Sequence, residues 1–358
     1  MRNNRTVTRT ALAKAGGIDR RELLIGAGAA VGAAALWSRG ALGQTGNLNV
    51  GLWGGDYQNL FDANVTKPFL ASKGLNVQYE AASGAPRKNK LLAERRLPRG
   101  TMDVACLNDI ESYEMQQAGV IDQLDPSKIP NSKNVIPALA KPYSMPHIVS
   151  GMVLVFNPAH MDPKSFADVW DPKYANKIGL ADGNYSSNIL FATLAAGGNV
   201  SDLEPGKKKL MELKKLGVRV YPTNEGLAQA LQSGEIWFTP MWRARANQWR
   251  NAGIPVVDRV ATEGIYPITF EVVLPKNSQN KEGAYALMNA MLEPAAQVGF
   301  AEKMGYVPTV TNAELPANLR ERLAFSAEEQ KKFLKPDLDY MARNNNALKD
   351  WWDREFLG

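Results

Sequence analysis

Leu48-Asn49-Val50-Gly51-Leu52-Trp53-Gly54-Gly55 is the stretch that decides the fold of this chain. Its apolar residues alternate, which is typical of a strand, and the paired glycines end that strand. A helical pattern follows, and the same order of strand and helix then repeats at 75–80, 88–97, 102–107 and 110–118. Strands separated by helices predict an α/β fold, with a mainly parallel sheet covered by helices on both faces.

A second alternating block predicts a separate α/β unit, with elements at 151–156, 178–180, 189–196, 210–216, 218–221, 226–233 and 236–239. The proline-rich segment 122–150 and the segment 263–270 are interpreted as crossings between the two units. A strand at 271–274, a helix starting near Lys281 and two terminal helices are expected beyond them. Because a chain of this length exceeds what one core comfortably fills, we expect two lobes.

The first 43 residues have the pattern of an export signal. Arg20-Arg21 precedes Leu23–Trp37, an apolar run of 15 residues, whereas a membrane-spanning helix needs about 20. With small residues at Ala41-Leu42-Gly43, the pattern indicates a twin-arginine signal cleaved before Gln44 rather than a membrane anchor. We therefore expect the Tat export machinery to be a partner, and the mature chain to be a soluble protein of the periplasm.

Charge and composition exclude several functional classes. The net charge is +6, but residues 1–43 carry seven basic side chains against two acidic ones, so the mature chain is near +1 and nucleic acid is not an expected partner. The single Cys106 and the proline-flanked His147 and His160 form no motif for a disulfide, a metal or a cofactor. The sequence also lacks a nucleophile elbow and a phosphate-binding loop. No enzyme is expected, and a secreted two-lobe enzyme is the alternative from another class.

Ordered segments near the C-terminus carry a family resemblance. Leu274–Ala284 holds a strand end, a polar loop and a helix start, and Met291-Leu292-Glu293-Pro294 and Met304-Gly305-Tyr306-Val307-Pro308-Thr309 follow it. In this order the chain resembles the extracellular solute-binding proteins of bacterial ABC importers, in the spermidine/putrescine-binding branch. The resemblance implies a type II periplasmic binding protein, a monomer whose two α/β lobes, joined by hinge strands, close on a solute. It also implies an inner-membrane ABC permease as partner.

The resemblance further implies where the lobes and the ligand lie. Residues 44–149 and 266–312 would form lobe 1, residues 150–265 would form lobe 2, and residues 313–358 would form C-terminal helices that pack on lobe 2. In open parallel sheets the carboxyl ends of the strands, with the first turns of the following helices, face the ligand. This rule selects the candidate binding residues.

In lobe 1 the candidates follow three predicted strands. The first strand leads into Trp53, Gly54, Gly55 and Tyr57, where the family often has an aromatic residue and a tyrosine, and glycines let backbone amides approach a ligand. Ser83 follows the second strand, where the family has a ligand-contacting serine, and Asn108 and Asp109 follow the third. The alternatives are a tryptophan at the rim of the core, a simple turn at Ser83, and helix capping by Asn108.

In lobe 2 the candidates are Asp182, Tyr185 and Trp242. The resemblance implies that Asp182 supplies a carboxylate to an ammonium group, with Tyr185 beside it, and that Trp242 sandwiches the ligand chain. The alternative for Asp182 is a helix cap with nothing bound.

The sequence departs from the polyamine binders at two places. Arg243 and Arg245 follow Trp242, and an arginine beside the ligand favours a carboxylate or phosphonate, although both could instead form an exposed basic helix face. The aspartate that polyamine binders carry five residues before Pro275 is Phe270 here. Glu271 is one step out of register and faces the opposite side of a regular strand, so this candidate contact reaches the ligand only if a bulge restores its orientation. We expect a cationic or zwitterionic solute, polyamine-like or amino-acid-like, with an anionic solute held by Arg243 or Arg245 as the alternative.

Overall fold

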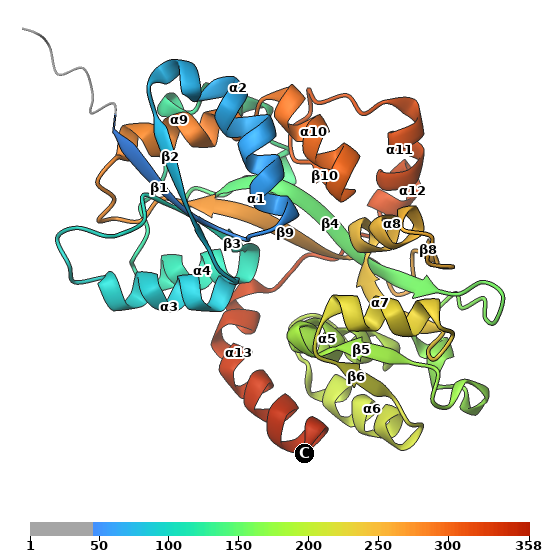
Figure 1. Cartoon of the computed structure of the whole chain (residues 1–358). Coiled ribbons are helices and arrows are strands. Elements are labelled where there is room, and N and C mark those ends of the chain that lie inside the picture. The colour runs from blue at the N-terminus through green and yellow to red at the C-terminus, as the bar shows by residue number, and fades with distance from the viewer. Residues whose placement is uncertain (1–45) are drawn as a thin grey trace, which may run out of the picture. The chain divides into compact units, whose positions relative to one another are not determined.

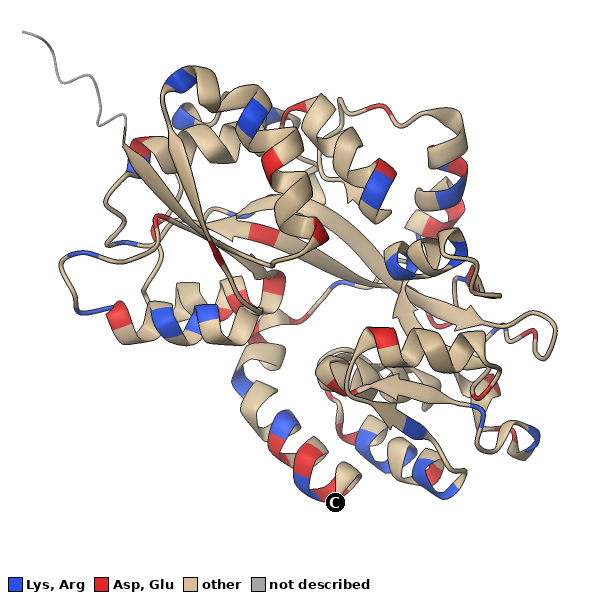
Figure 2. Ribbon diagram, viewed as in Figure 1, with Lys and Arg blue, Asp and Glu red and all other residues tan. Residues whose placement is uncertain are grey.

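The computed structural model describes residues 46–358, so the predicted export signal at 1–43 and its cleavage site lie outside the described residues. Throughout 46–358, every helix is too short or too polar to cross a membrane. Figure 1 labels the elements, and Figure 2 shows basic and acidic residues interspersed along helices such as α13 (Leu338–Trp351).

The sheet of the first lobe is built on the quoted stretch. Strand β1 (Asn47–Leu52) pairs in parallel with β2 (Asn76–Ala81) on one side and β3 (Val104–Asn108) on the other. The sheet continues with three antiparallel neighbours, in the order β3, β9 (Tyr266–Val273), β4 (Met145–Phe156) and β10 (Val307–Pro308). Leu48, Val50 and Leu52 are all 0% exposed, because the alternation places them on one face under helices.

Two long strands connect the lobes. The first half of β4 pairs with β9 from Met145 to Met152, and its second half pairs with β7 (Phe238–Trp242) and β8 (Val257–Arg259). The second-lobe sheet is extended by the parallel pair β5 (Gly179–Ala181) and β6 (Arg219–Tyr221), joined to β7 through a bridge from Ile178 to Phe238. The predicted boundaries at 150 and 265 therefore fall at these long strands.

The predicted crossings are partly regular structure. Most of 263–270 belongs to β9, which starts before the predicted strand at 271 because it forms a ladder with β4. Segment 122–150 holds short 3₁₀ turns η3 (Pro126–Lys128), η4 (Pro130–Asn134) and η5 (Pro137–Leu139), and then enters β4. The β4–β9 register shifts between Pro146 and Ile148, where a proline cannot donate to the ladder.

Helices cover both faces of the first-lobe sheet (Figure 1). One face carries α3 (Gly84–Glu94) and α4 (Asp109–Gln117), which bury Leu91 and Met115. The other face carries the broken helix α1 (Asp56–Phe61), η1 (Asp62–Thr66), α2 (Lys67–Phe69) and η2 (Ala71–Lys73), with α9 (Lys281–Met291) and α10 (Pro294–Met304). The helix starting at Lys281 and α4 occur where they were predicted, α3 begins four residues before its predicted start, and α10 was not predicted.

The second lobe has its own helical shell and its own core. Its helices are α5 (Tyr185–Ala195), α6 (Glu204–Lys215), α7 (Asn224–Gln232) and α8 (Arg243–Asn251), with 3₁₀ turns η6 (Phe166–Trp170), η7 (Pro172–Tyr174) and η8 (Asp182–Asn184). Phe191 and Phe238, both 0% exposed, anchor a core distinct from that of the first lobe.

The C-terminal segment contacts both lobes. It contains α11 (Ala317–Leu323), α12 (Ala327–Gln330), α13 and the π-helical turn η9 (Trp352–Leu357), more than the two helices predicted. Trp352 and Phe356 pack into the second-lobe core. However, α13 also packs against α4 of the first lobe. Assigning 313–358 to lobe 2 alone is therefore incomplete, because this helix lies across both units.

Candidate functional site

A row of aromatic side chains lies beside the end of β1. The rings of Trp53 and Phe270 meet in a T-shaped contact with centroids 5.0 Å apart and planes at 87°. Phe270 in turn meets Tyr306 at 5.4 Å and 89°. Edge-to-face contacts of this kind are favourable and fix ring orientation. We call Trp53, Phe270 and Tyr306 the aromatic row. Trp53 was predicted from the sequence, whereas the other two were not proposed as binding residues.

The glycines and the serine that accompany Trp53 are exposed. Gly54, Gly55 and Ser83 all have solvent-accessible surface. Gly55 has φ of +63°, a conformation that favours glycine and lets α1 start directly after the strand. Ser83 precedes α3 without capping it through its side chain. These residues leave backbone and hydroxyl groups open next to the row.

Tyr57 is a core residue. Its side chain is 5% exposed, and its hydroxyl lies 2.8 Å from Nδ1 of the buried His147. Burial lowers the pKa of His147 to about 3, so this histidine is neutral and able to share that hydrogen bond. Tyr57 touches Trp53 edge-on at 5.1 Å. The prediction that Tyr57 itself meets a ligand is corrected: its hydroxyl points into lobe 1 and its ring supports Trp53.

Glu271 lies inside the first lobe. Its side chain is 0% exposed and forms an ion pair with Lys141. Phe270, one step earlier on β9, joins the aromatic row, and successive strand residues point to opposite faces. The candidate role of Glu271 in ligand binding is therefore corrected. The register shift in the β4–β9 ladder lies on β4 and does not return the carboxylate to the side of the row.

Asn108 and Asp109 start α4. The Asn108 side chain accepts a hydrogen bond from the Glu111 amide at 2.8 Å, and the Glu111 carboxylate accepts from the Asn108 amide at 3.1 Å. This capping box satisfies the helix start, so the capping alternative describes Asn108. Asp109 is 5% exposed. Burial raises its pKa to about 7, opposed by Lys141 and reinforced by Glu271.

The C-terminal segment forms hydrogen bonds with Asp182 and Tyr185, the two predicted polar residues of lobe 2. The indole N–H of Trp352 donates to Oδ1 of Asp182 at 2.8 Å. Among the described residues no group donates to the other Asp182 oxygen, Oδ2. The Tyr185 hydroxyl donates to Oδ1 of Asn345 at 2.6 Å, and Nδ2 of Asn345 donates to Glu114 of α4 at 2.9 Å. One asparagine of α13 thus links the two lobes.

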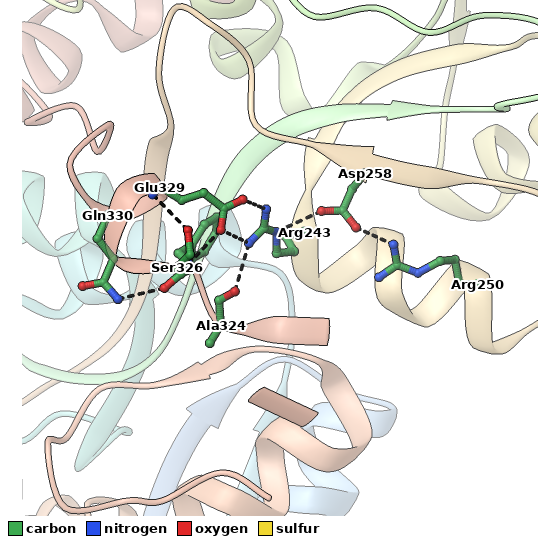
Figure 3. Close-up of polar contacts among 8 residues, drawn as sticks. Arg243, Arg250, Asp258, Ala324, Ser326, Glu329 and Gln330 are labelled. Carbon is green, nitrogen blue, oxygen red and sulfur yellow. Dashed lines mark hydrogen bonds and ion pairs between the residues drawn. The ribbon is translucent and has the colours of Figure 1, made fainter. Parts of the chain in front are cut away.

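Arg243 is occupied by an ion-pair network, drawn in Figure 3. Its Nε donates to Asp258 at 2.9 Å, its Nη2 to Glu329 at 2.6 Å, and its Nη1 to the carbonyl of Ala324 at 3.1 Å. The Arg243 side chain is only 8% exposed. The network borders a groove of about 1070 Å³ between α8 and the α11–α12 segment. Arg243 has a structural role in this network, and its contact with a ligand stays a prediction.

Arg245 is placed differently. It is half-buried, and its Nη1 donates to Gln248 at 2.9 Å. Across residues 46–358 no carboxylate pairs with it. Its partner Gln248 donates to the carbonyl of Met304 at 2.6 Å, two residues before Tyr306. Burial raises the pKa of Tyr306, and the charge of Arg245 opposes that rise.

Trp242 packs in the second-lobe core and is 8% exposed. Most of its surface is therefore used for packing, and its contact with a ligand stays a prediction. Cys106 is 0% exposed, as expected for a small apolar residue, and burial raises the pKa of its thiol to about 11. In the described part of the chain, no cluster of side chains suited to a metal ion occurs.

Comparisons with known proteins identify relatives. The family profile described as bacterial extracellular solute-binding protein matches residues 64–327. The spermidine/putrescine-binding periplasmic protein of Salmonella typhimurium is 32% identical over 257 residues, which cover 68% of this chain and 72% of the relative.

Solved structures share the fold. The Atu4243-GABA receptor has a TM-score of 0.76 at 21% identity, with 86% of this chain and 96% of that chain covered. A spermidine/putrescine ABC transporter substrate-binding protein from Streptococcus pneumoniae has a TM-score of 0.70 at 22% identity, with coverage of 85% and 99%. At these identities the likeness concerns the fold alone, and it confirms the predicted two-lobe α/β architecture.

Proposed function

This chain belongs to the bacterial extracellular solute-binding protein family, and from that premise we propose that it captures a small zwitterionic solute carrying one ammonium and one carboxylate group. The chain is a solute-binding protein, like its relative from Salmonella typhimurium. It would serve an ABC importer and catalyse no reaction of its own. Capture would proceed by closure of the lobes about β4 and β9, and the solute would pass to an inner-membrane permease.

The observation that carries this proposal is the charge around the aromatic row. Arg245 contacts Gln248, which in turn contacts Met304 near the Tyr306 end of the row, and it has no carboxylate partner among the described residues. A guanidinium left without an acid suits a carboxylate, which it can hold with two parallel hydrogen bonds. Of the acids proposed as ligand contacts, Asp182 keeps one oxygen available to an ammonium group, whereas Glu271 and Asp109 are buried inside the first lobe. One carboxylate with an open oxygen and one guanidinium without an acidic partner match a zwitterion.

A diamine is the second candidate, because the relative from Salmonella typhimurium is named for spermidine and putrescine. A polyamine carries at least two ammonium groups, and each needs a carboxylate or an aromatic face. Phe270 stands where the polyamine binders have an aspartate, so this chain offers fewer carboxylates for that purpose. A dianion would need two cationic partners. It is disfavoured because Arg243 is already paired with Asp258 and Glu329.

Three probes of matched length test the charge of the solute. γ-Aminobutyrate, putrescine and glutarate differ mainly in the groups at their ends, and their dissociation constants would be measured by isothermal titration calorimetry. We expect γ-aminobutyrate to bind most tightly. In Arg245→Gln it should weaken about 10- to 100-fold, since a hydrogen bond to a charged group contributes about 1.5–3 kcal/mol. Gln248→Ala, which removes the Arg245 partner but no charge, is the matched control.

Different outcomes would reject different parts of the proposal. Tightest binding of putrescine would favour the diamine. Equal affinities in Arg245→Gln and in the unmodified protein would remove Arg245 from the site. Asp182→Asn should weaken γ-aminobutyrate and leave glutarate unchanged, because only the former carries an ammonium group. Small-angle scattering with and without the tightest probe tests closure, and an unchanged profile would contradict it.

We further propose that the mature protein is a monomer in the periplasm after Tat export. The support is the Arg20-Arg21 pair in the sequence and the periplasmic relatives. The double variant Arg20→Lys, Arg21→Lys should leave uncleaved protein in the cytoplasm, as judged by cell fractionation. The N-terminal sequence of the exported protein should begin at Gln44. Export of the double variant at the normal level would contradict the twin-arginine assignment.

A further inference from the structure

Arg87 is a buried cation directly behind Trp53. It lies in α3, its side chain is 1% exposed, and its guanidinium carbon is 4.7 Å from the centroid of the Trp53 ring. Its Nη1 donates to the carbonyl of Ala82 at 2.9 Å. Gly51 of β1 makes room for it, because a Cβ there would lie 2.7 Å from the Arg87 Cδ. The side chain therefore occupies a space shaped for it between α3 and β1.

This guanidinium is not neutralised locally. Its Nε and Nη2 have no hydrogen-bond partner within 46–358, and no carboxylate there lies within ion-pair distance. The acids whose charge acts on it are Glu111 on α4 and Glu80 on β2. The Glu111 carboxylate accepts a hydrogen bond from the Asn108 amide, and the Glu80 carboxylate forms an ion pair with Lys90. An arginine keeps its charge even when buried, so a net positive charge persists beneath the ring.

That charge changes what Trp53 can offer to a ligand. Trp53 is half-buried, with one face toward Arg87 and perpendicular ring contacts with Tyr57 and Phe270. An aromatic ring attracts a cation through the negative potential of its faces. A cation already stacked on one face draws on that potential and repels a second cation approaching the other. Trp53 therefore presents a surface suited to alkyl groups and anions, and unfavourable for ammonium.

We propose that Arg87 is a specificity-determining residue, which excludes a second ammonium group from the neighbourhood of Trp53 and so selects amino-carboxylate solutes over diamines. The proposal rests on the proposed function in that Trp53 is taken to contact the solute. Arg87 acts through Trp53 and positions its ring. No contact between Arg87 and the ligand is required.

The test compares two ligands in variants of one residue. Arg87→Met keeps an unbranched apolar stem and removes the charge, and Arg87→Lys keeps the charge. The ratio of the dissociation constants for putrescine and γ-aminobutyrate should fall about tenfold in Arg87→Met, equivalent to about 1.4 kcal/mol. It should change by less than about threefold in Arg87→Lys. Arg95→Met, which removes an exposed arginine just after the same helix, is the matched control and should leave the ratio unchanged.

A purely structural role would give another result. If Arg87 only supports packing, Arg87→Met would weaken both ligands in parallel and leave the ratio constant, which would overturn the proposal. Should Arg87→Met fail to fold, Arg87→Gln, which is shorter and polar, replaces it with the same expectation. A constant ratio in Arg87→Gln would equally overturn the proposal.

A second measurement needs no ligand. Iodide and caesium quench tryptophan fluorescence, and the Trp53 contribution is the difference between a protein and its Trp53→Phe partner. The positive charge should make iodide the better quencher of Trp53, and the iodide-to-caesium ratio should fall at least twofold in Arg87→Met. An unchanged ratio would overturn the proposal. If neither probe binds the unmodified protein, the proposed function fails while this measurement still decides the role of Arg87.

Discussion

Replacing Arg243 with methionine should destabilise the protein by about 3 kcal/mol while leaving solute affinity unchanged. Arg243 and Asp258 are each 8% exposed as side chains, and Glu329 is 28% exposed. Removing one partner of a buried ion pair costs about 3–5 kcal/mol, because the other charge is left without compensation. The lower end applies here, since Asp258 keeps Arg250 and Glu329 keeps its cap on Ser326.

The assay is urea unfolding followed by tryptophan fluorescence, with the midpoint and slope fitted for each variant. Arg245→Met is the matched control, because Arg245 is half-buried and has no acidic partner in the described part of the chain. That control should lose less than about 0.5 kcal/mol of stability and should weaken γ-aminobutyrate. A stability loss below about 1 kcal/mol in Arg243→Met, together with weaker binding, would refute the structural assignment of Arg243.

Trp242→Ala should lose about 3–5 kcal/mol of stability in the same assay, because this side chain is 8% exposed in the second-lobe core. Unchanged stability would mean that Trp242 is not needed for packing and would favour its role as a ligand contact. The pKa of Asp109 is raised to about 7 from 3.8, so the folded state holds a proton that the unfolded state has lost, and stability should fall as pH rises from about 4 to 7. Asp109→Asn should reduce this fall in melting temperature between pH 4 and 7, and an identical pH profile would contradict the shift. Asn345→Ala removes the link between Glu114 and Tyr185. Double electron–electron resonance between spin labels on Lys73 and Gln229 should therefore show a broader distribution of distances. The same width in both proteins would mean that Asn345 does not restrain the lobes.

Much of the fold was predictable because its elements are specified locally. The alternation in 48–53 and the helix start at Lys281 depend on neighbouring residues, and both elements occur as expected. The start of β9 was missed because Tyr266 to Phe270 become a strand only through pairing with β4. The C-terminal helices were assigned to one lobe because sequence periodicity shows that a helix has an apolar face but not which surface covers it.

The candidate site was predictable at the level of strand ends. Trp53 and Asp182 come from that rule, and the opposite facing of Glu271 follows from strand geometry. The choice between Arg243 and Arg245 could not be made in this way, since the partner that occupies Arg243 is Glu329. Arg87 was missed for a similar reason. On a basic helix the sequence does not reveal which arginine turns inward.

The sequence by itself determined the order of strands and helices, the family, and the absence of the aspartate that polyamine binders carry at the position of Phe270. These properties follow from residue types and spacings along the chain. Only the tertiary structure decided which charges are free, because charges cancel through space and not along the sequence. Asp182 meets Trp352 across 170 positions, and Arg243 meets Glu329 across 86. Those distant pairings leave Arg245 and the buried Arg87 as the uncompensated charges beside the aromatic row.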